Sequence, residues 1–175
     1  MTLQTTHADH RAHSPPVDGA PRVLLKAEAP KTGYVDGAWW PYTDELTIEL
    51  PGLLAVLAMR LGPIHHVAYR LGEWASAPNE LEIAGRTVRL AGHRYRSDHT
   101  IEVLGDRDRR LVVLIIPPYT DAHDAFVAMT SASAVNNASG VTDLLMIGRR
   151  EHRAHTQRAA AVQRWDSERE AQLLG

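Results

Sequence analysis

The chain has 175 residues, of which 44% are hydrophobic, and a formal net charge of -2. This length suits one domain with tails, and the nearly neutral charge gives no general attraction to nucleic acid or to anionic membranes. The absence of cysteine excludes disulfides, zinc–thiolate and iron–sulfur sites, and cysteine nucleophiles. No apolar run suits a signal peptide or is long enough to span a bilayer. We therefore predict a soluble cytoplasmic protein that has no membrane contact.

Residues 1–21 form a polar leader that we predict to be disordered, because it lacks periodic apolar residues and contains three prolines. His7, His10 and His13 are spaced three residues apart in this leader. Such a tract could capture a metal ion, but a disordered tract loses conformational entropy when it binds. We therefore favour incidental histidines, and we predict no metal site and no cofactor in the protein.

Residues 22–27 predict a first strand, and residues 30–41 predict a turn region that carries two adjacent tryptophans. Leucines recur at spacings of three and four along residues 44–61, which predicts one face of a helix. Pro51 interrupts this run, so we expect a short helical lead-in and then a helix with Pro51 in its first turn. Gly62-Pro63 should end that helix.

The middle of the chain reads as a series of short strands. Two hairpins are predicted, one around Ala84-Gly85 and one around residues 105–109. Residues 111–116 are six consecutive apolar residues, which indicates a central strand buried on both faces. A second helix should follow over residues 121–134, with Thr120 as its N-cap.

The predicted fold class is α+β: an antiparallel sheet of about five to six strands with two packed helices and a projecting C-terminal helix. The strand connections are short, so we expect no parallel pairing, and we expect the helices to cover one face of the sheet. The predicted organisation is a leader over residues 1–21, one domain over residues 22–141 and a charged helical tail over residues 142–175. The tail has a thin apolar stripe, so it should project from the core.

Residues 35–41, which read Val-Asp-Gly-Ala-Trp-Trp-Pro, resemble an uncharacterised actinobacterial family known as a domain of unknown function. Glu49-Leu50-Pro51 and Ile116-Pro117-Pro118 add to this resemblance, which covers residues 24–145. The resemblance implies a small cytosolic domain and brings no activity, cofactor or catalytic residue with it.

Adjacent residues of an extended segment point to opposite sides, so the Trp39 and Trp40 side chains should lie on different surfaces. A large aromatic ring outside the core is typical of a recognition site. We therefore predict that the protein recognises a protein partner or a small ligand, rather than catalysing a reaction. The predicted site residues are Asp36, Trp39, Trp40, Tyr42, Glu73 and Trp74.

Two alternatives remain open at this stage. Basic residues with one aromatic on a predicted strand pair, together with an Arg-rich tail, are typical of a nucleic-acid- or ribosome-associated factor. Its candidate residues are Arg86, Arg89, Arg94, Tyr95, Arg96, Arg149, Arg150 and Arg153. The second alternative is an unrecognised enzyme with Asp36 as its acid or base, although an Asx-type turn with Gly37 is the more ordinary role for that residue.

Histidines offer a weaker case for a metal. His65 and His66 are adjacent on a predicted strand and so cannot share one ion, whereas His93 and His99 could meet across a hairpin near Asp98.

Overall fold

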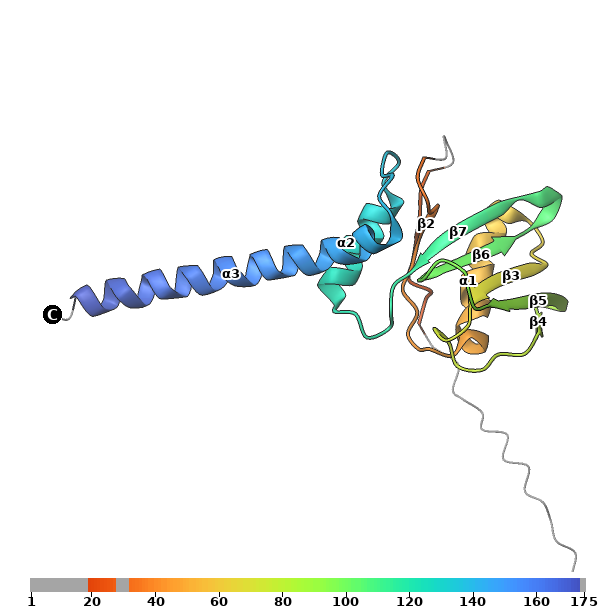
Figure 1. Cartoon of the computed structure of the whole chain (residues 1–175), viewed down its shortest axis with the longest axis horizontal. Coiled ribbons are helices and arrows are strands. Elements are labelled where there is room, and N and C mark those ends of the chain that lie inside the picture. Colours follow the sequence, from red (N-terminus) through yellow and green to blue (C-terminus); the bar gives the residue numbers. More distant parts are fainter. Residues whose placement is uncertain (1–18, 28–31, 174–175) are drawn as a thin grey trace, which may run out of the picture.

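The computed structural model describes residues 19–27 and 32–173 of the chain (Figure 1). Most of the predicted leader, including its three histidines, lies outside the described residues. In chain order the elements are β1 (Val23–Leu25), β2 (Gly37–Trp39), α1 (Leu46–Leu61), β3 (His66–Arg70), β4 (Glu80–Ile83), β5 (Arg86–His93), β6 (Thr100–Leu104), the 3-10 helix η1 (Asp106–Asp108), β7 (Arg110–Ile115), α2 (Ala122–Ser133) and α3 (Val141–Leu173).

The fold is α+β, and its sheet has seven strands in the order β1-β2-β7-β6-β3-β5-β4. The prediction of a purely antiparallel sheet is wrong, because β2 pairs with β7 and β3 pairs with β5 in parallel. Short connections still join the antiparallel pairs β4–β5 and β6–β7. The parallel pairs arise between strands that are not consecutive: β4 lies between β3 and β5 in sequence, and most of the domain lies between β2 and β7.

Helices cover both faces of the sheet, which contradicts the expectation of one covered face. The leucine stripe of α1 packs on one face in a cluster that includes Trp39, Val67 and Val113. On the other face, α2 and the first turn of α3 pack over β2 and β7, and Leu144 of α3 is buried there. Strand β7 is therefore buried on both faces, as its apolar run predicts.

Local signals in the sequence explain where most elements end. Ala84 and Gly85 both have positive φ angles, 51° and 73°, as a two-residue hairpin turn requires. Gly62 ends α1 with a positive φ of 67°, which favours glycine, and its N–H donates to the carbonyl of Ala58. The N-cap of α2 is Asp121 and not Thr120, because the Asp121 carboxylate accepts from the backbone N–H of His123.

Pro51 lies within a continuous α1 rather than in the first turn of a second helix, so the predicted lead-in is wrong. Its ring is exposed, so it faces away from the core. A proline here removes one backbone N–H, and with it one hydrogen bond of the helix. The leucine face of α1, which is buried along its whole length, outweighs that loss.

The predicted turn region at residues 30–41 contains the strand β2, which lies between β1 and β7 in the sheet. Gly37 permits this position, because a Cβ at that residue would lie 2.3 Å from the carbonyl oxygen of Leu24. The glycine therefore serves close strand packing rather than the predicted Asp-Gly turn.

The long helix α3 extends away from the sheet after its first turns (Figure 1). Trp165 on its outer half is exposed to solvent, as are the neighbouring described side chains. This arrangement agrees with the predicted projecting helix, and α3 begins one residue before the predicted boundary. Within the described residues, no helix is sufficiently long and apolar to cross a membrane.

A buried carboxylate joins β2 to the start of α1. Glu49 is 7% exposed, and its Oε1 accepts from the backbone N–H groups of Tyr42 and Thr43 at 3.0 and 2.7 Å. The Thr43 hydroxyl donates to the same oxygen at 3.0 Å. Glu49 therefore fixes the segment that follows β2.

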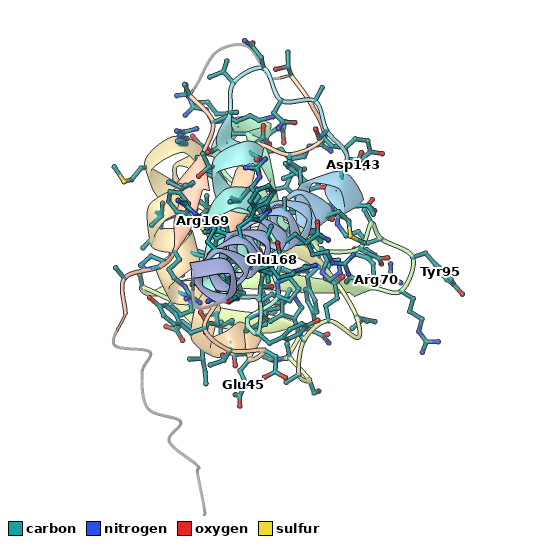
Figure 2. All side chains as sticks on the ribbon, turned by 90° about the vertical axis from the view of Figure 1, so that its left-hand side faces the viewer. Glu45, Arg70, Tyr95, Asp143, Glu168 and Arg169 are labelled. Carbon is teal, nitrogen blue, oxygen red and sulfur yellow. The ribbon has the colours of Figure 1, made fainter. Side chains whose placement is uncertain are left out.

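We predict that Glu49→Ala lowers the free energy of unfolding by about 2 kcal/mol, because it leaves the partly buried N–H groups of Tyr42 and Thr43 without their acceptor. Urea denaturation of the full chain measures this change. Glu45→Ala is the matched control: Figure 2 shows Glu45 at the surface, where a substitution should change stability by less than about 0.5 kcal/mol. Equal losses in the two variants would contradict this role for Glu49.

Candidate functional site

A cavity of about 520 Å³ brings together three of the six predicted site residues. We call it the aromatic pocket. Tyr42, Glu73 and Trp74 line it, whereas Asp36, Trp39 and Trp40 do not. The remaining lining residues are Thr43, Asp44, Gly72, His99, Ile115, Pro117, Pro118 and Tyr119. This volume lies within the usual range for small-molecule sites.

The sheet topology explains why these residues meet. Strands β2 and β7 are parallel, so the segments that follow them, with Tyr42 after β2 and Tyr119 after β7, leave the sheet at the same edge. Strand β6 is antiparallel to both β7 and β3, so His99 before β6 and Glu73 after β3 also lie at this edge. The pocket thus forms at strand ends that are distant in sequence.

Glu73 is held by the residue at the start of β6. Its Oε1 accepts from the backbone N–H of His99 at 2.6 Å and lies 3.9 Å from Nδ1 of the His99 ring. The second carboxylate oxygen, Oε2, is buried and has no hydrogen-bond partner among the described residues. The backbone of His99 has a φ of 53°, an unusual conformation for a residue other than glycine.

Trp74 forms one wall of the pocket and is supported from the core. Its ring stacks on the ring of Trp39, with centroids 5.3 Å apart and an interplanar angle of 21°. Trp39 is 1% exposed and belongs to the core cluster under α1. The indole Nε1 of Trp74 is buried and has no partner within the described part of the chain. Trp39 is therefore a core residue that positions Trp74.

The residues that line the aromatic pocket favour a positively charged ligand. Glu73 and Asp44 supply two carboxylates, while Tyr42, Trp74 and Tyr119 supply aromatic rings. A cation is attracted both to a carboxylate and to the face of an aromatic ring. His99 and Tyr119 were not among the predicted site residues, because nothing local in the sequence indicates that the strand ends next to them converge.

Trp40 lies on the opposite side of β2 from Trp39, as the alternation of an extended segment predicts. It packs beside the α2 cluster, and the Arg22 guanidinium lies over its ring, 3.4 Å from the centroid. Arg22 also donates to the carbonyls of Trp40 and Pro41, at 2.9 and 2.8 Å. The guanidinium lies over the Tyr42 ring as well, at 3.9 Å, so Arg22 connects Trp40 to a wall of the aromatic pocket.

Asp36 lies at the other end of β2 and has a structural contact. Its Oδ2 accepts from the backbone N–H of Val112 at 2.8 Å, and its own N–H donates to the carbonyl of Val112 at 2.7 Å. The side chain thus extends the pairing of β2 with β7. This cross-strand contact differs from the Asx-type turn that the sequence suggested.

The structure does not bring the predicted basic residues into one patch. Arg86 is opposite Ile83 on the α1 side of the sheet, whereas Arg89 lies on the other face, opposite Glu80. Arg96 is paired with Glu102. Arg94 and Tyr95 are in the loop after β5, where the Tyr95 side chain points away from the body (Figure 2).

The basic residues predicted for the tail lie on α3. Arg153 is exposed, and the side chains of Arg149 and Arg150 are outside the described part of the structure. Among the described residues, no three His, Asp or Glu side chains form a group that could hold a metal ion.

This architecture defines a small α+β domain with a pocket at one edge of a mixed sheet. The chain belongs to DUF5994, a family of unknown function, whose model matches residues 22–132. The match includes all seven strands, α1 and nearly all of α2, but not α3. Comparison with curated proteins and with solved structures gave no match.

On the sheet face that carries Arg89, burial lowers the pKa of His66 below its ordinary value of 6.5, and the positive charges of His65 and Arg89 lower it further. The folded protein therefore binds this proton less tightly than the unfolded chain. The resulting stability is complete above the unfolded pKa and is lost as the pH falls through it toward the lower folded value.

We predict that lowering the pH from about 7.5 to about 5 destabilises the wild-type protein more than the His66→Gln variant. Urea denaturation at the two pH values measures the difference. The same pH dependence in both proteins would show that His66 is not the group responsible.

Proposed function

We propose that the protein binds a small molecule that carries an amine, and that the aromatic pocket is its site. The observation that carries this proposal is the convergence of Tyr42, Glu73 and Trp74 on one cavity of about 520 Å³ at the carboxyl ends of β2 and β7. These three residues come from two segments that are distant in sequence, one with Tyr42 and one with Glu73 and Trp74, and each of them attracts a cation. The proposal keeps the predicted recognition role and moves it from the tryptophan pair to Trp74.

Two residues that line the pocket each have a buried polar atom without a hydrogen-bond partner among the described residues, and these atoms support this choice. Leaving a buried polar group without a partner costs about 1–3 kcal/mol, and more for a charged group. Both Oε2 of Glu73 and Nε1 of Trp74 are in this position among the described residues. Both atoms are closed to solvent in the structure, so a small movement of these two side chains would let an ammonium group of the ligand pair with Glu73 and an acceptor of the ligand pair with Trp74.

A small ligand agrees better with the structure than either a protein partner or a nucleic acid. The aromatic residues predicted for recognition are divided between the core, the Arg22 contact and the pocket wall, so they do not form one flat surface. The basic residues are separated by the sheet, and Glu102 and Glu80 lie close to two of them.

Without cysteines the protein suits a reducing compartment, so we propose that it acts in the cytoplasm.

The test is a titration of the full chain with benzylamine, in which NMR monitors the indole N–H signals of the four tryptophans. We predict a saturable shift of the Trp74 signal and no shift of Trp165, which is exposed on α3. Benzyl alcohol has a similar shape but no charge. Its dissociation constant should be at least about tenfold higher, because it lacks the charge-assisted hydrogen bond.

The informative variant is Glu73→Gln, whose amide oxygen can still accept from the N–H of His99. It should weaken benzylamine binding about tenfold without a comparable effect on benzyl alcohol. Glu80→Gln removes an exposed carboxylate from the edge strand β4 and serves as the matched control. Absence of any saturable shift, or equal binding of amine and alcohol, would contradict the proposal.

A further inference from the structure

A second cavity, of about 500 Å³, lies at the opposite ends of β2 and β7 from the aromatic pocket. We call it the basic pocket. Four basic and two acidic side chains line it: Lys26, Arg60, Arg109, Arg110, Asp36 and Asp108. Asp36 and Arg110 lie at the amino ends of β2 and β7 and line the basic pocket. Tyr42 and Pro117 lie beyond the carboxyl ends of the same two strands and line the aromatic pocket. The two pockets therefore share the same pair of parallel strands and have opposite charge.

Lys26 is the buried cation of this pocket, since it is 6% exposed. Its Nζ donates to the carbonyl oxygens of Thr32 at 2.7 Å and of Asn137 at 2.8 Å. An ammonium group has three donors, and two neutral carbonyls do not neutralise its charge. Burying a charge is costly unless it is paired, so a fixed Lys26 at this depth favours a negative group nearby.

Arg60 and Arg109 are oriented in the same manner by neutral acceptors. Arg60 donates from Nη1 to the carbonyl of Lys26, and Arg109 donates from Nη1 to the carbonyl of Arg60 at 3.0 Å. The three cations thus form a chain in which each of the arginines bonds to the backbone of the preceding member. A guanidinium has five donors, so most donors of each arginine remain for other partners.

Among the described residues, neither carboxylate of the pocket, Asp36 or Asp108, forms an ion pair with these three cations. Asp36 uses its Oδ2 on the backbone N–H of Val112. Within the described part of the chain, the ion pairs involve neither Lys26 nor Arg60 nor Arg109. Arg110 is the exception in the pocket, with its Nη1 3.8 Å from Oε1 of Glu102.

We infer that the basic pocket binds the oxyanion of a small molecule, a phosphate or a carboxylate group. Planar guanidinium groups suit both anions, because each offers parallel N–H donors to two oxygens. Lys26 contributes a buried positive charge to the lining of the pocket, and Arg60 and Arg109 contribute guanidinium groups. This site is separate from the aromatic pocket and does not depend on its ligand.

The test is an NMR titration of the full chain with inorganic phosphate and, separately, with malonate, against sodium chloride at matched ionic strength. We expect saturable shifts of the backbone amides of residues 109–111, which line the pocket. Saturation by phosphate alone assigns the site to a phosphorylated molecule, and saturation by malonate alone assigns it to a carboxylate. Shifts that sodium chloride reproduces, or no saturable shift with either anion, would overturn the inference.

Two variants connect the shifts to the pocket. Arg109→Gln removes a pocket cation with an exposed side chain and should raise the dissociation constant about tenfold, the value of one charge-assisted hydrogen bond. Arg107→Gln is the matched control from the same loop: its side chain is 82% exposed, lies 3.6 Å from Asp106 and does not line the pocket. Equal weakening in the two variants would show a diffuse charge effect and would also overturn the inference.

Discussion

The insertion of β2 between β1 and β7 is the constraint on which the rest of the structure depends. This strand has only three residues, yet it pairs on both sides and carries core side chains on both faces. Gly37 lets the backbone of β1 approach, Ala38 is fully buried toward α2, and Trp39 fills the core under α1. Asp36 and Arg22 then fix the two ends through hydrogen bonds to backbone groups. The main role of the Asp-Gly-Ala-Trp-Trp-Pro segment is therefore structural: its residues fix the short strand β2 between β1 and β7.

Because β2 and β7 run in parallel, each end of the pair presents two chain segments at the same edge of the sheet. The two edges differ in charge. Carboxylates and aromatic rings line the pocket at the carboxyl ends, and Lys26 with three arginines lines the pocket at the amino ends. Glu49 and Arg22 both contact the segment just after β2, so the residues that hold the strand also shape a pocket wall. This coupling explains why residues of one motif serve both fold and site.

Local features of the fold could be predicted from the sequence, and long-range features could not. The α1 stripe and the hairpin at Ala84-Gly85 depend on residues a few positions apart, and periodicity and turn chemistry report such contacts directly. The β2–β7 pairing joins residues more than seventy positions apart, and no local pattern distinguishes a short inserted strand from a turn. The same limit applies to the site. Glu73 and Trp74 were predicted as partners of the tryptophan pair, but His99 and Arg109 acquire their positions only when strand ends converge.

Amide hydrogen exchange of the full chain tests the central claim, that β2 is a fixed member of the sheet. The N–H of Asp36 donates to the carbonyl of Val112, and the N–H of Trp40 donates to the carbonyl of Arg22. If β2 is held as described, both amides should exchange as slowly as those of the β6–β7 hairpin. Exchange of these amides as fast as that of the exposed loop at residues 94–95 would contradict the account, because neither pocket would then have a fixed wall.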